Sequence, residues 1–430
     1  MLQSINGPST FEIRLAAPWF CPFLESDYSG QEPFELEITE LNNNICSGSP
    51  WVMGADGFAG FAHFAPGTIR HHGAGHFEFT FAEEQQLLYA QTDQPAAALD
   101  AFNQAVIEAW PEADRAFGDP EILRQHEYCT WVEQRLCRTI APEPDVLTQE
   151  FADRYLDRIL QLECPPGKFT LDHGWFPKTG PGSIGDWAFD RKAFPNPDRF
   201  IARLVKEGFT PGIWLAPLLV QEGTKLHAKP DSRSGRSLKW GGIDACGTDH
   251  FDTLAVNEST EAHYRAVIRR LSGMGFRKFK LDIFYAPKAE VAPVLEMIGG
   301  LIREIDSGAE IEAHTPDIHL SRYVNVIRAN DVWLRSSKDL QLAADHIRVC
   351  RMSAPHRITN LDHLAGNAPR TPQDLALAHI GLCTVSKGYP VVSALPDRYG
   401  KEALDLTLDL LRRHAACCGH LTQDALAARV

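Results

Sequence analysis

Residues 261–314 read EAHYRAVIRRLSGMGFRKFKLDIFYAPKAEVAPVLEMIGGLIREIDSGAEIEAH, and this stretch decides the fold class. It contains two amphipathic segments, Glu261–Met274 and Val291–Ile305, which predict helices. Each is followed by a short apolar segment, Lys278–Phe284 or Glu310–His314, which predicts a strand. Strands that alternate with helices in this way are typical of a parallel sheet with crossover helices.

The same alternation extends from about Tyr128 to the closing helix, and it predicts an α/β fold of the (β/α)8 TIM barrel type. The expected strands are Tyr128–Gln134, Lys168–Trp175, Thr210–Pro217, Lys278–Phe284, Glu310–His314, Val332–Ser336, Arg357–Asp362 and Tyr389–Ala394. The further expected helices are Thr148–Leu162, Asp198–Glu207, Pro372–Thr384 and Lys401–Ala416. A long polar insertion, Leu218–Asn257, follows the third strand, and insertions of this length are usually functional or disordered.

The first part of the chain has a different pattern. Apolar and polar residues alternate in Phe11–Leu15, Phe34–Ile38 and Phe77–Phe81, which predicts an antiparallel sheet with one buried face. A helical stretch, Pro95–Trp110, then leads to the barrel. We therefore expect a small, mostly β domain with a connecting helix over residues 1–125, and the barrel over residues 126–430.

Composition restricts the partners. The 430 residues carry a formal net charge of −14, and no Lys- or Arg-rich run suggests binding to nucleic acid or to an anionic membrane. No segment approaches the roughly 20 apolar residues of a membrane span, and Met1–Pro22 lacks the pattern of a signal peptide. The 10 cysteines form no CxxC pair, which favours buried free thiols in a cytoplasmic protein. We expect no metal and no cofactor, and a homo-oligomer stays open.

Active sites of such barrels lie at the C-terminal ends of the strands, so the polar residues expected there matter most. Lys280 and Asp282 are two positions apart and therefore share one face of the fourth strand. Buried charges cost several kcal/mol each unless they are paired or solvated. The two residues are either a structural ion pair or a carboxylate that an adjacent ammonium keeps ionised. Asp339, just past the expected sixth strand, is either a second reactive carboxyl group or an ordinary helix cap.

Several motifs, in this order on successive strands, resemble glycoside hydrolase family 36 and its relatives in families 27 and 31. The resemblance runs from about Tyr128 to Tyr399. It rests on Leu171-Asp172-His173-Gly174-Trp175-Phe176, Gly185-Asp186-Trp187, Gly208–Pro217, Met274-Gly275-Phe276, Lys280-Leu281-Asp282 and Arg335-Ser336-Ser337-Lys338-Asp339.

That resemblance implies a retaining α-glycosidase, similar to the α-galactosidases, that acts on an oligosaccharide or glycoside. It implies Asp282 as the nucleophile and Asp339 as the general acid/base. The residues that the resemblance and their positions place around the sugar are Trp131, Asp172, His173, Trp187, Trp214, Lys280, His314 and Arg335. Ordinary core packing is the alternative for the tryptophans, and a supporting hydrogen-bonding role is the alternative for the two histidines.

The sequence departs from the family pattern at the sugar-binding positions. Asp172-His173 stands where the family has Asp-Asp, and His314–His319 replaces a loop rich in Cys and Gly. The bulk of the family's large N-terminal sandwich and its C-terminal β domain are also missing. The sugar therefore stays open between galactose, another epimer and an anionic sugar. Three other activities also stay open: a family 31-like α-glucosidase, a transglycosylase similar to the raffinose synthases, and a sugar-binding pseudoenzyme.

Overall fold

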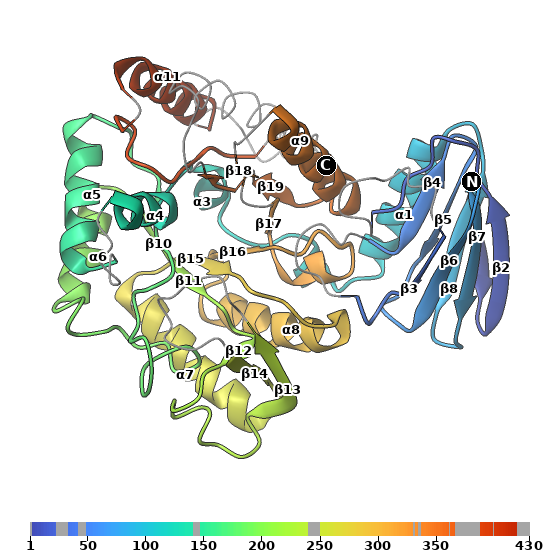
Figure 1. The fold of residues 1–430 in the computed structure, drawn as a ribbon, viewed down its shortest axis with the longest axis horizontal. Helices are drawn as coiled ribbons and strands as arrows, with labels where there is room; N and C mark the ends of the chain where they lie inside the picture. Colours follow the sequence, from blue (N-terminus) through green and yellow to red (C-terminus); the bar gives the residue numbers. More distant parts are fainter. Residues whose placement is uncertain are drawn as a thin grey trace.

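Two parts of unequal size make up the molecule, a β-rich N-terminal part and a larger part that mixes strands and helices (Figure 1). The computed structural model describes residues 2–22, 33–41, 49–140, 147–239, 250–329, 332–333, 337–360, 362–365, 388–398 and 400–418. Among the helices of these ranges, none combines the length and the apolar character needed to cross a bilayer.

The N-terminal part consists of two four-stranded antiparallel sheets, with strand orders β1-β8-β5-β4 and β2-β7-β6-β3. Its strands are β1 Gln3–Asn6, β2 Ser9–Arg14, β3 Phe34–Glu37, β4 Trp51–Gly54, β5 Gly57–Phe61, β6 Gly67–Gly73, β7 His76–Phe81 and β8 Gln86–Gln91. In β5, Ala59 and Phe61 pack toward the second sheet, whereas Phe58 packs against helix α1 (Pro95–Glu108). The sheet that contains β5 is therefore covered on both faces. The sequence predicted a single sheet with one buried face instead.

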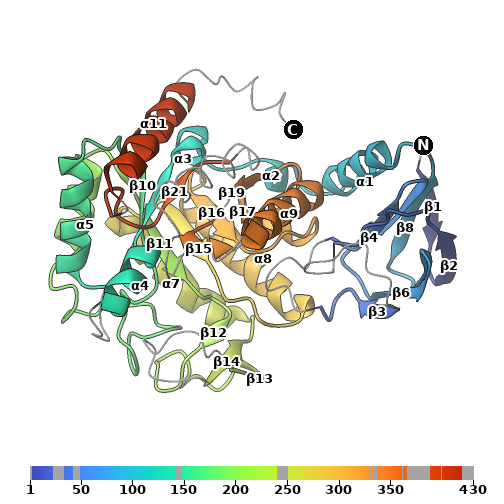
Figure 2. The same ribbon diagram turned by 45° about the horizontal axis from the view of Figure 1, so that its top comes forward.

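The larger part contains an eight-stranded parallel sheet with the order β19-β17-β16-β15-β11-β10-β9-β21. Its strands are β9 Glu127–Cys129, β10 Lys168–Leu171, β11 Thr210–Leu215, β15 Lys278–Leu281, β16 Glu310–Ala313, β17 Val326–Arg328, β19 Ile358–Asn360 and β21 Val391–Val392. Figure 2 shows these strands surrounded by helices. The expected barrel, preceded by a small antiparallel β domain, is confirmed.

Helices pack around this sheet through their apolar faces. Beyond α1, they are α2 Glu112–Arg115, α3 Pro120–Arg124, α4 Trp131–Ile140, α5 Gln149–Gln161, α6 Pro197–Lys206, α7 Glu258–Met274, α8 Lys288–Ile305, the short 3₁₀ helix η2 Leu320–Tyr323, α9 Ser337–Ser353 and α11 Lys401–Cys418. Local chemistry sets the ends of α7, because Asn257 and Thr260 form a capping box and Gly275 adopts a left-handed φ of 109°. The expected helix Pro372–Thr384 lies outside the described residues.

Two strand predictions were wrong. The sixth barrel strand is β17, because Asn325 fixes this segment beside β16: its amide donates to Ile311 O at 3.0 Å, and its side chain accepts from Ile311 N at 2.8 Å. Val332–Trp333, the start of the expected sixth strand, forms β18 and pairs with β20 (Leu364–Ala365) in a separate two-stranded sheet. The first strand ends at Cys129, because Gln134 N already donates to Thr130 O at 2.9 Å in the geometry that starts α4.

The insertion after the third strand has structure of its own. Within its described residues, β12 (Leu219–Val220), β14 (His250–Leu254) and β13 (Arg233–Lys239) form a three-stranded antiparallel sheet. Asp186 ties a neighbouring loop to this insertion, since its carboxylate accepts from Lys225 N and Leu226 N, both at 2.9 Å.

Charged residues fill the N-terminal end of the barrel interior. In β15, Phe279 and Leu281 belong to the apolar core, and Lys278 and Lys280 alternate with them. Lys278 donates to Glu312 at 2.8 Å and to Glu127, and Tyr389 OH lies 2.7 Å from Glu310 and 2.9 Å from Glu312. We call this group the floor cluster; it consists of Glu127, Lys168, Lys278, Glu310, Glu312 and Tyr389, all buried.

The N-terminal part also holds the helix that follows the fourth barrel strand. Helix α8 has no side-chain cap, and its first amides, Lys288 N and Ala289 N, donate to Leu41 O at 3.0 Å and Thr39 O at 2.9 Å. The Lys288 side chain forms a buried ion pair with Asp317. A segment of the N-terminal part therefore supplies the hydrogen-bond acceptors that the start of α8 needs.

Candidate active site

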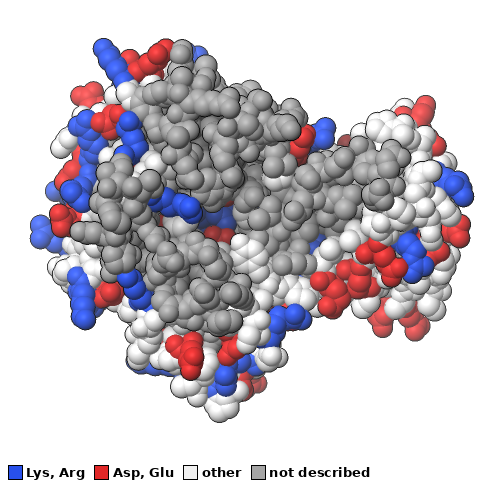
Figure 3. Space-filling model, viewed as in Figure 1, with Lys and Arg blue, Asp and Glu red and all other residues white. Residues whose placement is uncertain are grey.

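Seven polar residues gather at the C-terminal ends of the barrel strands, where such barrels place their active sites. We call them the mouth cluster; they are Asp172, Lys280, Asp282, His314, Arg328, Asp362 and His363. Figure 3 shows a hollow in the barrel part with basic and acidic atoms at its base. The sequence predicted four of the seven, whereas Arg328, Asp362 and His363 were missed.

Asp282 directly follows β15, and three donors hold its carboxylate. Arg328 Nη2 donates to Oδ1 at 2.6 Å, Ile283 N donates to Oδ1 at 2.9 Å, and Trp214 Nε1 donates to Oδ2 at 2.9 Å. Its side chain is 18% exposed, against 3% for that of Arg328. Both in-plane lone pairs of Oδ1 are thus engaged, whereas Oδ2 accepts one hydrogen bond from the residues that the structure describes.

The surroundings keep Asp282 ionised. Burial alone would raise the pKa of its carboxyl group, but the charge of Arg328, together with that of Lys280 and the Trp214 hydrogen bond, moves the pKa well below its usual range. The main cation is therefore Arg328, at the end of β17 on the far side of β16, and not Lys280 as the sequence suggested. A carboxylate that stays deprotonated is suited to nucleophilic attack.

Lys280 is bound on the other side of the site. Its ammonium lies 2.7 Å from Asp172 Oδ2 and 2.6 Å from His363 Nε2. Because an ammonium can only donate, Nε2 of His363 accepts, and its Nδ1 carries the proton that faces Ser393 Oγ. Burial and the charge of Lys280 lower the pKa of His363 to about 4, which agrees with a neutral ring.

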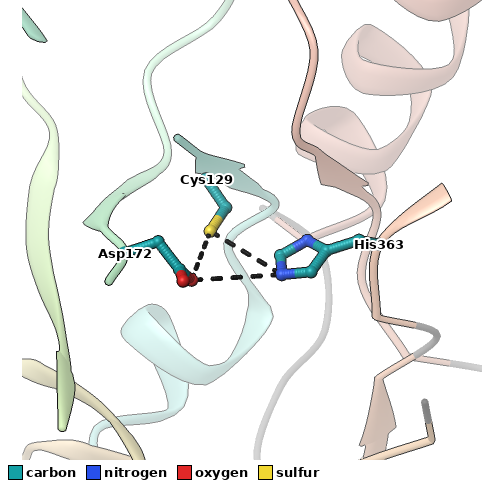
Figure 4. A group of neighbouring side chains, drawn as sticks. All are labelled: Cys129, Asp172 and His363. Atoms are coloured by element: carbon teal, nitrogen blue, oxygen red, sulfur yellow. Dashed lines mark hydrogen bonds and ion pairs between the residues drawn. The ribbon is translucent and has the colours of Figure 1, made fainter. Parts of the chain in front are cut away.

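Cys129, Asp172 and His363 point toward one another from three strands, and their ligand atoms lie within 4.8 Å of one another (Figure 4). These are residue types that bind transition metals. A metal bound to both Asp172 and His363 would lie about 2.0–2.2 Å from each, in the place that the Lys280 ammonium occupies. The Cys129 thiol, which burial and the nearby Asp172 keep protonated by raising its pKa, donates to Asp172 Oδ2 at 3.2 Å. These side chains therefore already bind a cation, which is the Lys280 ammonium.

Aromatic rings line one side of Asp282. The ring of Trp214 lies 5.0 Å from that of His173 and 6.0 Å from that of Trp187. Trp187 is fully buried, and its indole N–H donates to Tyr264 OH at 3.3 Å, so it supports Trp214 from behind. Trp131 is half-buried at the start of α4, with its ring 6.4 Å from His173.

Backbone strain is concentrated here. Ile283, the residue after Asp282, has a φ of 59°, which is exceptional for a β-branched side chain. Trp187 and Asp362 also have positive φ values, of 55° and 65°. Such conformations cost of order 1–3 kcal/mol each and cluster at functional sites. At Ile283 the turn brings the backbone N–H onto Asp282 Oδ1.

Two predicted residues cannot be placed. Arg335 lies outside the described residues. Asp339 is the third residue of α9, but its side chain is outside the described part of the chain. Its proposed role as acid/base stays a prediction.

The missed residues had weak sequence signals. Arg328 directly follows the apolar pair Val326-Ile327, but the sixth strand was expected further along the chain. Asp362 and His363 follow a strand that was expected correctly, and a carboxylate beside an imidazole at a strand end could have been singled out.

Solved structures that superpose on this chain include glycoside hydrolases of families 31 and 36. A glycoside hydrolase family 31 dextranase from Flavobacterium johnsoniae, complexed with glucose, superposes with a TM-score of 0.70 at 12% identity, covering 99% of this chain and 57% of the dextranase. A family 36 α-galactosidase from Geobacillus stearothermophilus gives a TM-score of 0.64 at 12% identity, covering 96% of this chain and 62% of that one. The α-galactosidase of Thermus thermophilus, in complex with stachyose, gives 0.59 at 17% identity, covering 85% and 79%.

The chain thus spans little more than half the length of the dextranase, and at these identities the likeness concerns the fold. No protein-family model and no curated protein matches the sequence.

Proposed function

We propose that this protein is a retaining, exo-acting α-glycosidase, with an α-galactoside as the first candidate substrate. The observation that carries the proposal is the ionised Asp282 at the barrel mouth, with Oδ1 engaged by Arg328 and Ile283 N and Oδ2 accepting, among the described residues, from Trp214 alone. The α-glycosidase fold of the barrel supports it.

In the first step Oδ2 of Asp282 attacks the anomeric carbon while the bond to the leaving oxygen breaks. Asp339 donates a proton to that oxygen, and a glycosyl ester forms on Asp282. In the second step Asp339 takes a proton from water, which attacks the same carbon and frees the sugar with its α configuration retained. Asp172, His173, Trp214 and Lys280 bind the sugar, and Arg328 holds Asp282 in both steps.

A second candidate is an α-glucosidase, because the family 31 dextranase superposes with a TM-score of 0.70. A transglycosylase would use the same first step, and a sugar hydroxyl would replace water in the second step.

The cysteines also bear on the location of the protein. The free thiols Cys21, Cys129, Cys137, Cys164 and Cys350 support a cytoplasmic location.

Turnover of nitrophenyl α-galactoside, α-glucoside and α-xyloside by wild type and variants tests the proposal. Asp282→Ala should lower kcat by about 10⁴-fold or more on the accepted substrate. Asp198→Ala, at an exposed aspartate of α6, is the matched control and should keep full activity. A wild type that binds sugar but hydrolyses none of the three would indicate a sugar-binding pseudoenzyme.

Asp339→Ala tests the proposed acid/base role of Asp339 separately from the proposed nucleophile role of Asp282. It should leave the first step with the good leaving group nitrophenolate nearly intact, and added azide should restore the second step as the glycosyl azide. Full activity of Asp339→Ala on an unactivated glycoside would show that another group is the acid/base.

A further inference from the structure

Asp362 is an unusual buried carboxylate. Its side chain is 1% exposed, yet neither oxygen has a hydrogen-bond partner among the described residues. His314 Nε2 lies 3.4 Å from Oδ2, Arg328 Nε lies 3.5 Å from Oδ2, and His363 Nε2 lies 3.4 Å from Oδ1. The positive charge of Arg328 stabilises the carboxylate, but its lone pairs stay open. Unsatisfied polar atoms in a protein interior call for an explanation, because each costs about 1–3 kcal/mol.

His314 shows the same deficit. Its Nε2 has no hydrogen-bond partner among the described residues, although the ring is buried. Burial, followed by the charge of Arg328, lowers the pKa of His314, so the ring is neutral near pH 7 and carries one N–H. A hydroxyl oxygen about 2.8 Å from both His314 Nε2 and Asp362 Oδ2 is geometrically compatible with their 3.4 Å separation.

The fold holds Asp362 in this position. Its φ of 65° is strained, and its amide donates to Asn360 Oδ1 at 2.5 Å. Asn360 in turn donates to Glu312 at 2.7 Å and to Tyr389 OH at 3.2 Å, both members of the floor cluster. A strained residue that a rigid network fixes, with open lone pairs, is arranged for a ligand rather than for internal pairing.

The open atoms lie beside the reaction centre. A single guanidinium, that of Arg328, contacts Asp282 Oδ1 through Nη2 at 2.6 Å and approaches Asp362 Oδ2 through Nε at 3.5 Å. A group bound by Asp362 therefore belongs to the sugar under attack, not to a distant part of the substrate. Two carboxylates on this side disfavour an anionic sugar.

We propose that His314 and Asp362 form a subsite for one neutral hydroxyl of the glycone. His314 Nε2–H donates to the hydroxyl oxygen, and the hydroxyl hydrogen is donated to Asp362 Oδ2. The subsite rests on the proposed glycosidase function and adds to it the residues that select the sugar. A site built to bind a hydroxyl rejects the analogue that lacks it, because its own polar groups are then left unpaired.

The test uses the nitrophenyl α-glycoside that wild type hydrolyses best, together with its 2-, 3-, 4- and 6-deoxy analogues. One analogue should lose about 100-fold or more in kcat/KM. His314→Ala and Asp362→Asn should lower kcat/KM for the parent glycoside by a similar factor, yet scarcely change it for that analogue. Asparagine suits position 362, because it tolerates a positive φ. His126→Ala, at a buried histidine before β9 at the opposite barrel end, should keep the full discrimination of wild type.

Equal losses on every analogue in both variants would overturn the subsite, and so would a wild type that accepts all deoxy analogues alike. The latter result needs no variant, so the proposal can fail even if the variants do not fold. Calorimetric binding of the free parent and deoxy sugars to Asp282→Ala separates the two proposals. Discrimination in binding without any turnover by wild type would refute the glycosidase and keep the subsite.

Discussion

The floor and mouth clusters are two groups of ionisable side chains inside one barrel, and they differ in how their carboxylates are bound. Each carboxylate of the floor cluster accepts from a lysine: Glu310 from Lys168 at 2.7 Å, and Glu127 and Glu312 from Lys278. In the mouth cluster, Asp362 accepts no side-chain hydrogen bond from a described residue.

This difference predicts different roles for two residues of the same type. Lys278 and Lys280 lie two positions apart on β15, and both are buried. The ammonium of the floor lysine binds Glu127, Glu312 and Tyr389, so we expect this lysine to act on stability. The mouth lysine lies near Asp282, the proposed nucleophile, so we expect it to act on catalysis as well.

Lys278→Met should have the largest effect. It leaves Glu127 and Glu312 without their ammonium, and removing one member of a buried charge group destabilises by about 3–5 kcal/mol. Urea unfolding measures the loss, and Lys206→Met, at an exposed lysine of α6, serves as the control. An unchanged unfolding midpoint for Lys278→Met would show that the floor cluster contributes nothing to stability.

Lys280→Met should lower kcat/KM by roughly 100-fold, since hydrogen bonds to charged groups contribute about 1.5–3 kcal/mol. Loss of a nearby positive charge should also raise the pKa of Asp282 and move the acidic limb of the kcat/KM profile upward. Stability should fall less than in Lys278→Met, because one carboxylate, Asp172, loses its ammonium. Normal kinetics with a lowered Tm would make Lys280 a purely structural residue.

Trp214→Phe removes the one donor to Asp282 Oδ2 found among the described residues and keeps most of the aromatic contact with His173. We expect a loss of about 10-fold in kcat and a small upward shift of the same acidic limb, because the hydrogen bond favours the ionised form. Trp175→Phe is the matched control, since its indole N–H donates to a backbone oxygen, Trp214 O, at 3.0 Å. Equal kinetics of the two variants would contradict a direct role for the Trp214 N–H.

Buried histidines should give the smallest effect, a loss of stability in mild acid. Burial lowers the pKa of His126, near the floor cluster, to about 3, so the unfolded chain binds a proton near pH 6.5 and the folded chain does not. Stability is therefore present above pH 6.5 and is lost as the pH falls toward 3. Between pH 7 and 5.5 the free energy of unfolding should fall by ~1 kcal/mol for this histidine. Urea unfolding of wild type and His126→Asn at both pH values checks this, and equal slopes would refute it.

The sequence predicted the fold well where strands have local signals. Lys278-Phe279-Lys280-Leu281 alternates within one strand, so its inward and outward faces follow from the chain itself. The sixth strand was misplaced, because Val326-Ile327 and Val332-Trp333 are similar apolar pairs only a few residues apart. The contact that distinguishes them, between Asn325 and Ile311, joins positions that local patterns do not connect.

The same limit applies to the site. The position of Asp282 at a strand end could be predicted. The presence of Trp214, Asp172 and Lys280 in the same site could also be predicted. The partner of Lys280 could not, because Asp172 and His363 reach it across the barrel from other strands. Arg328 was missed because its strand, β17, was not predicted.

The hydrogen bonds from Lys288 N and Ala289 N to the N-terminal part make these two amides reporters of domain docking. They can exchange with solvent deuterium only when the segment around Thr39 and Leu41 moves away from the start of α8. That helix follows β15 and Asp282 along the chain. A separation of the two parts would therefore release the segment after Asp282 before the barrel itself opens, so loss of the proposed activity should precede global unfolding.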